Sequence, residues 1–212
     1  MKYLNKKLLL FSTLQLIFLL PCMLYAACNQ SSDPRLFKIQ GTKQHLYVVE
    51  GECFRELIEA IGNGQDIDIT YAVIKGEIDF TNTEFFHLTP FYEAGVFLNK
   101  NDIHHFNEIY KSPIFTYFIA FIKSKIIIRY SIISDGIRTQ NDVTQTVCLF
   151  KKPVNFSNTV FSSTTNFNCA RFSRKIDFSN ARFLSSAYFF NARFECDANF
   201  NGAKFFKECF FH

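Results

Sequence analysis

The chain has 212 residues, enough for one or two ordinary domains. Apolar residues make up 48% of it and charged residues 20%, a balance that excludes an intrinsically disordered chain. The formal net charge is +4, but three of the positive charges lie in the first 27 residues, which hold no acidic residue. The remaining net charge of +1 is too small to indicate a nucleic-acid-binding protein.

Residues 1–27 predict export. Three lysines precede an apolar stretch over residues 8–20, and Pro21 ends that stretch. The small residues Ala26 and Ala27 then suit a cleavage site, so we interpret 1–27 as a signal peptide and expect a periplasmic or secreted protein. Two membrane-anchored alternatives stay open. Either the segment is not cleaved, or Cys28, which follows a sequence similar to a bacterial lipobox, is lipidated.

Residues 28–66 are interpreted as a lead-in with a capping helix. Apolar residues from Phe54 to Ile61 follow helical spacing, and Gly62 ends the pattern, which predicts a helix over residues 53–61. Cys28 and Cys53 both lie in this lead-in. Because export would place them in an oxidising compartment, we expect them to form a disulfide unless Cys28 is lipidated.

Phenylalanine recurs at fixed intervals from residue 150 onwards. The residue two positions before each of these phenylalanines is small or modest in size, and the residue between is usually polar. Since residues two apart in an extended segment point to the same side, each segment sends one large and one small side chain inward. We call the large inward residues the ladder. Steps of six and five alternate without a gap along Phe150, Phe156, Phe161, Phe167, Phe172, Phe178, Phe183, Phe189, Phe194, Phe200, Phe205 and Phe211.

A weaker form of the same spacing occurs upstream. Steps of five and six join Ile69, Ile74, Phe80, Phe85 and Phe91, which predicts a first coil over residues 67–96. Residues 97–147 are interpreted as an insertion with a stretch of ambiguous register and a polar loop. In that stretch, a ladder through Ile122, Ile127, Ile132 and Ile137 and one through Ile128 and Ile133 fit about equally well, although the first brings Lys125 and Asp135 inward.

Segments such as residues 167–172 (FNCARF) and 178–183 (FSNARF) resemble the pentapeptide-repeat family in its Phe-rich variant. The resemblance implies an all-β solenoid over residues 148–212, a right-handed quadrilateral β-helix with a solid core and 22 residues per coil. A short N-terminal helical cap and an irregular insertion complete the expected fold. Some members of the family dimerise end to end, so the resemblance also implies a homodimer joined through residues 200–212.

The sequence does not indicate catalytic chemistry. It contains no glycine-rich nucleotide motif, no nucleophile elbow and no Cys/His spacing of a metal site. We therefore expect no enzyme, no cofactor, no metal and no nucleic-acid partner. The protein is predicted to be an exported structural or protein-interaction module, with a protein partner or a second copy of itself.

Two other functions stay open. Residues 148–212 hold nine basic and four acidic residues, a net charge of +5. With 22 residues per coil, Arg171 stacks on Arg193 and Arg182 on Lys204, on two opposite faces. The first alternative is an envelope-associated protein that binds through these four residues. The second is a carbohydrate-active β-helix enzyme, which needs paired carboxylates; the acidic residues of the repeat are Asp177, Glu195, Asp197 and Glu208.

Overall fold

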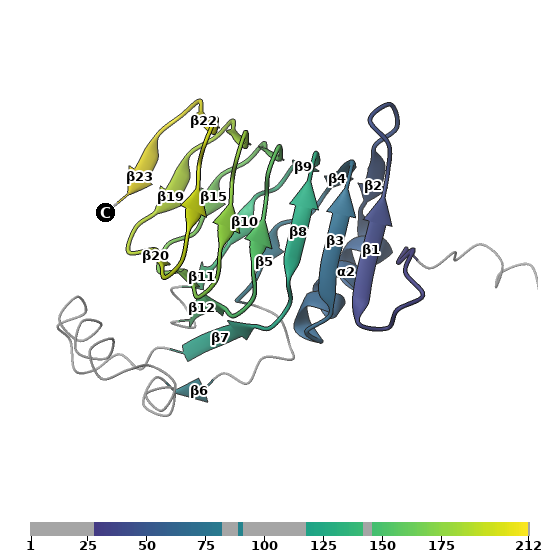
Figure 1. The fold of residues 1–212 in the computed structure, drawn as a ribbon, viewed down its shortest axis with the longest axis horizontal. Helices are drawn as coiled ribbons and strands as arrows, with labels where there is room; N and C mark the ends of the chain where they lie inside the picture. The colour runs from purple at the N-terminus through teal and green to yellow at the C-terminus, as the bar shows by residue number, and fades with distance from the viewer. Residues whose placement is uncertain (1–27, 82–88, 91–117, 142–145, 212) are drawn as a thin grey trace, which may run out of the picture.

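The computed structural model describes residues 28–81, 89–90, 118–141 and 146–211. These residues form a solenoid of short strands stacked along one axis, with β1 at one end and β23 at the other (Figure 1). The strands fall into four sheets, which we call A, B, C and D in the order in which one coil passes through them. Neighbouring strands are parallel, except that β6 and β11 pair antiparallel with β7 and β12.

Each coil contributes one short strand to each sheet. Sheet A contains β1 (Leu36–Gln40), β3 (Asp66–Thr70), β8 (Ile126–Arg129), β13 (Val154–Asn155), β17 (Ile176–Asp177) and β21 (Ala198–Asn199). Sheet B contains β2 (Tyr47–Val49), β4 (Ala72–Ile74), β9 (Ile132–Ile133), β14 (Val160–Phe161), β18 (Arg182–Phe183) and β22 (Lys204–Phe205). Sheet C contains β5 (Ile78–Asp79), β10 (Ile137–Arg138), β15 (Thr165–Asn166), β19 (Ala187–Phe189) and β23 (Cys209–Phe211). Sheet D contains β6 (Thr89–Pro90), β7 (Phe118–Ile122), β11 (Gln140–Asn141), β12 (Thr146–Phe150), β16 (Arg171–Phe172) and β20 (Arg193–Phe194).

The predicted coil length is confirmed. Val154 pairs with Ile176 and Ile176 with Ala198, so equivalent residues are 22 apart. The order of the strands makes sheets B and D opposite sides of the coil, and sheets A and C the other two sides. Four sheets of stacked, mostly parallel strands fit the right-handed β-helix that the sequence predicts.

The ladder fills the interior of the coils. Its eight members from Phe150 to Phe189 are at most 1% exposed. Rings of successive coils stack face to face: the centroids of Phe161 and Phe183 are 4.6 Å apart, and those of Phe183 and Phe205 are 4.7 Å apart. The prediction of a buried ladder holds only in part for Phe194, Phe200 and Phe205, which are half-buried, and it is wrong for Phe211, which is 49% exposed. The reason is that, among the described residues, no further coil packs against it.

The alternating steps build two kinds of corner. Five-residue steps turn tightly between sheets A and B and between sheets C and D. In these turns Asn158, Asn180 and Asn191 adopt positive φ, a conformation that Asn tolerates better than most residues. Six-residue steps give a wider corner of three linking residues between sheets B and C and between D and A. Side chains support the tight turns too: the Asp177 carboxylate accepts a hydrogen bond from the Ser179 N–H at 2.8 Å.

The first coil is assembled from two separate pieces of chain. Ile69, Ile74 and Phe80 are buried as predicted. Phe85 and Phe91 lie outside the described residues, and the ladder position that the prediction gave to Phe85 on sheet D belongs to Ile122, which pairs with Phe150. The predicted continuous coil over 67–96 is therefore wrong beyond Phe80. Spacing alone cannot show that the chain leaves a coil and re-enters it much later.

The ambiguous stretch takes the second of the two registers. Ile128 and Ile133 are fully buried, and they pair with Ile69 and Ile74 of the preceding coil. This register leaves Lys125 and Asp135 exposed to water, whereas the other would have buried both charges. Residues 118–141 therefore form ordinary coil strands rather than an insertion.

The N-terminal end of the solenoid is covered by α2 (Gly51–Gly62), which confirms the predicted helix. The helix follows β2 and precedes β3, and it buries Leu57, Ala60 and Ile61 against the core. Strand β1 has no counterpart in the sequence prediction. Its residues Phe37 and Ile39 are at most 2% exposed and extend the inward positions by one more row.

Candidate interaction surfaces

The four basic residues singled out in the sequence lie in register on opposite faces. Arg171 pairs with Arg193 on sheet D, and Arg182 pairs with Lys204 on sheet B. The Arg171 side chain is only 14% exposed, and its Nε donates to the Glu195 carboxylate. The Arg182 guanidinium lies 5.3 Å from the centroid of the Phe206 ring. The structure thus does not bring the four together, and Arg171 and Arg182 have partners within the chain.

A denser group of positive charge lies where sheet D passes into sheet A. Three stacked links, residues 123–125, 151–153 and 173–175, each carry two basic residues. We call this group the basic corner. All its members are exposed: Lys123, Lys125, Lys151, Lys152, Arg174 and Lys175. The sequence signal was present, because each pair lies within three residues after a ladder residue of a six-residue step. The links after Phe150 and Phe172 could be placed from the sequence, and only the link at 123–125 depends on the register of Ile122.

The basic corner is bounded at both ends. Towards the N-terminus, Lys152 Nζ lies 2.7 Å from the Asp66 carboxylate. Burial raises the pKa of Asp66, but the hydrogen bonds from the Lys152 side chain and the Lys125 N–H, with the charges of both lysines, outweigh it and lower the pKa. Towards the C-terminus, the next link in the stack is Glu195-Cys196-Asp197. The positive charge is therefore confined to three successive links.

The opposite wide corner, between sheets B and C, has a different character. In the later coils its links are Ser162-Ser163-Thr164 and Leu184-Ser185-Ser186. The Thr164 and Ser185 hydroxyls lie 3.3 Å apart and are hydrogen-bonded. The two wide corners thus have the same backbone construction, and only one of them is basic.

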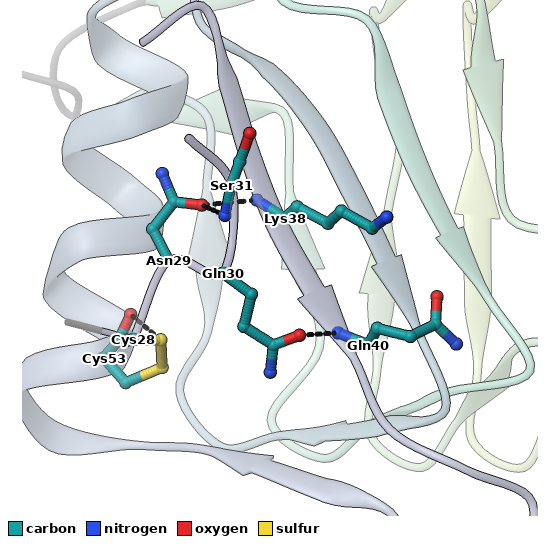
Figure 2. The surroundings of a disulfide bond; sticks show 7 residues. All are labelled: Cys28, Asn29, Gln30, Ser31, Lys38, Gln40 and Cys53. Atoms are coloured by element: carbon teal, nitrogen blue, oxygen red, sulfur yellow. Dashed lines mark hydrogen bonds between the residues drawn. A yellow bond between two sulfur atoms is a disulfide. The ribbon is translucent and has the colours of Figure 1, made fainter. Parts of the chain in front are cut away.

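The lead-in residues satisfy the outer edge of β1 (Figure 2). Asn29 Oδ1 accepts the Lys38 N–H at 2.8 Å, and Gln30 Oε1 accepts the Gln40 N–H at 2.9 Å. A disulfide joins Cys28 to Cys53 of α2, with the two Cα atoms 5.3 Å apart. The pairing expected from the sequence thus ties the lead-in to the capping helix, and together they cover an edge that would otherwise be open to pairing.

The C-terminal coil presents a contrasting surface. Among the described residues, no strand pairs with the outer edges of β21, β22 and β23. Phe206, Phe210 and Phe211 are 51%, 42% and 49% exposed. Phe210 stacks on Tyr188 of the preceding coil, with the ring planes 2° apart. This end combines free strand edges with exposed aromatic rings.

Metal ligands and thiols are the remaining chemical groups of interest among the described residues. No group of three or more His, Cys, Asp or Glu residues among them could hold a metal ion. Burial and then the nearby charge of Asp79 raise the pKa of the Cys148 thiol far above its usual range, and burial raises that of Cys209 to about 11. Both thiols are therefore protonated at neutral pH. In the described part of the chain, no helix has the length and apolarity needed to cross a membrane.

These features define a structural repeat protein built as a right-handed β-helix. Residues 170–212 match a family model described as pentapeptide repeats (9 copies). The match supports, over this segment, the resemblance to pentapeptide repeats that the sequence indicates. No curated protein and no solved structure matches the chain.

Proposed function

We propose that the protein is an exported, non-enzymatic interaction module whose C-terminal coil binds a second copy of the same coil. The observation that carries this proposal is the contrast between the two ends. Asn29, Gln30 and α2 cover the N-terminal end, whereas β21, β22 and β23 present free edges beside three exposed phenylalanines. A free strand edge pairs readily with another strand, and a compact apolar patch marks an interface.

The stacked ladder supports a non-enzymatic role. Phenylalanine rings occupy the axis of the later coils with centroids 4.6–5.6 Å apart between successive coils, so the interior is filled by side chains. Three of the four carboxylates in the repeat have partners within the chain, since Glu208 accepts a hydrogen bond from the Ser186 hydroxyl at 3.4 Å. Asp177 accepts the Ser179 N–H and Glu195 binds Arg171, which weighs against the alternative of a carbohydrate-active enzyme with paired free carboxylates.

Export is supported by the order of residues 1–27 and by the Cys28–Cys53 disulfide, since disulfides persist in oxidising compartments. The alternative of an envelope-associated protein that binds through Arg171, Arg182, Arg193 and Lys204 is less well supported. Arg171 is largely buried and paired, and the four residues lie on opposite sides of the coil.

Light scattering on the exported product tests the self-association. We expect twice the monomer mass for the wild type, and the monomer mass for a variant with Phe210→Glu and Phe211→Glu. A matched control with Val48→Glu and Leu184→Glu changes two other exposed apolar residues and should keep the dimer. A wild-type monomer, a polydisperse aggregate or a control that also dissociates would reject the dimer. N-terminal sequencing of the product outside the cytoplasm tests export separately, with cleavage expected after Ala26 or Ala27.

A further inference from the structure

We propose that the basic corner binds a flexible linear polyanion whose phosphate or carboxylate groups lie along the solenoid axis. The proposal concerns the links at residues 123–125, 151–153 and 173–175, and it is independent of the self-association proposed for the C-terminal coil. It also differs from binding through the faces of sheets B and D, because none of the four residues on those faces belongs to the corner.

The first argument is the arrangement of the charges. The three links stack directly on one another, as the pairs Ile122–Phe150 and Phe150–Phe172 before them and Ile126–Val154 and Val154–Ile176 after them show. Neighbouring parallel strands are about 4.8 Å apart, so the three links cover about 10 Å of the axis. Two cations at each level give six positive charges in a short stack. Such a stack can neutralise two or three successive anionic groups of a polymer.

The second argument is that the backbone holds these levels in place. The N–H groups of Lys151 and Ser173 each donate to a ladder carbonyl of the coil before, at 3.0 Å. On the other side of the links, the Val154 N–H donates to the Lys175 carbonyl at 3.0 Å. The bases of the long side chains are therefore fixed, and a ligand would have to order only their flexible ends.

The third argument is that much of the charge is available. In the part of the chain that the structure describes, Lys152 pairs with Asp66, and Lys151 lies 5.6 Å from the centroid of the Phe121 ring. Lys123, Lys125, Arg174 and Lys175 are exposed and form no ion pair there. Concentrating positive charge in this way destabilises the folded state by self-repulsion, and a polyanion would relieve that repulsion.

The fourth argument concerns the shape of the partner. The corner is the edge between sheets D and A, and its three links stack along the axis, so their charges follow one line. A flexible chain can follow that line and place an anion at each level. A flat anionic surface would touch only the outermost ammonium groups, so we favour a polymer over a membrane. The neutral link Asn63-Gly64-Gln65 and the acidic link Glu195-Cys196-Asp197 limit the contact to the three basic levels.

Fluorescence anisotropy with labelled inorganic polyphosphate tests the proposal on the full chain. We expect binding that weakens as salt rises, because the polymer releases counterions on binding. A variant with Lys125→Gln, Arg174→Gln and Lys175→Gln should lose about tenfold or more in affinity and show a shallower salt dependence. A control with Lys43→Gln, Arg55→Gln and Lys75→Gln removes the same net charge from exposed residues elsewhere and should stay within about twofold of the wild type.

The outcomes distinguish a phosphate polymer from a carboxylate polymer, and binding at the basic corner from binding by net charge alone. Polygalacturonate in place of polyphosphate distinguishes carboxylate from phosphate, and preferential binding of either polymer through the corner supports the proposal. Equal losses in the two triple variants would show that binding follows net charge alone and would overturn it. Absence of binding to both polymers, or binding only to vesicles of phosphatidylglycerol, would also overturn it. Unchanged thermal unfolding midpoints confirm that the exposed substitutions leave the fold intact.

Discussion

Truncation of Phe183 to alanine is the sharpest test of the ladder. Phe183 is 1% exposed, and its ring lies between those of Phe161 and Phe205, both within 4.7 Å and with ring planes 4° apart. Replacing a buried phenylalanine by alanine costs about 3–5 kcal/mol, because the lost transfer energy adds to the energy of the cavity. For a chain of this size that corresponds to a fall of about 6–20 °C in the unfolding midpoint.

The matched control is Phe206→Ala, one coil further on. Phe206 is 51% exposed and contacts Arg182 through a cation–π interaction, so its removal should cost about 1 kcal/mol or less. The assay is thermal and denaturant unfolding followed by circular dichroism on both variants. Equal destabilisation by the two substitutions would refute the assignment of inward and outward positions. Because coils of a solenoid stabilise their neighbours, the Phe183 variant should also expose the C-terminal coils to faster amide exchange.

Two further predictions concern the disulfide and a glycine at a wide corner. Denatured, non-reduced exported product should contain four free thiols, from Cys148, Cys169, Cys196 and Cys209, and a count of six would exclude the Cys28–Cys53 bond. Gly136→Ala should destabilise the protein by about 2–5 kcal/mol, because its φ is +97° and a Cβ would lie 2.2 Å from the Thr164 carbonyl oxygen. Gly51→Ala, at a φ of +56° but with nothing within 4 Å, should cost only about 1 kcal/mol; similar losses in both variants would argue against close packing of the corner.

The repeat was predictable where its signal is local and repeated. The ladder from Phe150 onwards follows from alternating steps of five and six, because every coil there has the same length and every large inward residue is the same amino acid. The helix near Phe54 was predictable for a similar reason, since its apolar spacing lies within a single element.

The upstream coils were less predictable because their pairing partners are far apart in sequence. Ile67 pairs with Ile126, and the ladder place on sheet D of that coil is taken by Ile122. A spacing rule carries no information about such a long excursion, so it continued the ladder into Phe85. Strand β1 was not predicted because its five residues have only two inward side chains, Phe37 and Ile39. That pattern is too short to identify a strand from spacing. Only the first link of the basic corner depends on the register of Ile122. The links at 151–153 and 173–175 follow Phe150 and Phe172 of the predicted ladder and were missed because stacking was considered only for outward residues within the strands.

Among the coils that pass through all four sheets, both departures from the regular length occur at the passage from sheet C to sheet D. Equivalent residues are 59 apart between the first and second complete coils and 28 apart between the second and third, against 22 afterwards. The additional residues fall after β5 and after β10. In the incomplete first turn, α2 takes the place of the strands of sheets C and D, and residues 41–46 lengthen the link from β1 to β2. Sheets A and B remain in register throughout, so extra chain at this corner changes neither the rise nor the rotation of the solenoid. The C–D corner of one coil can therefore accommodate an added segment without a change in the structure of the other coils.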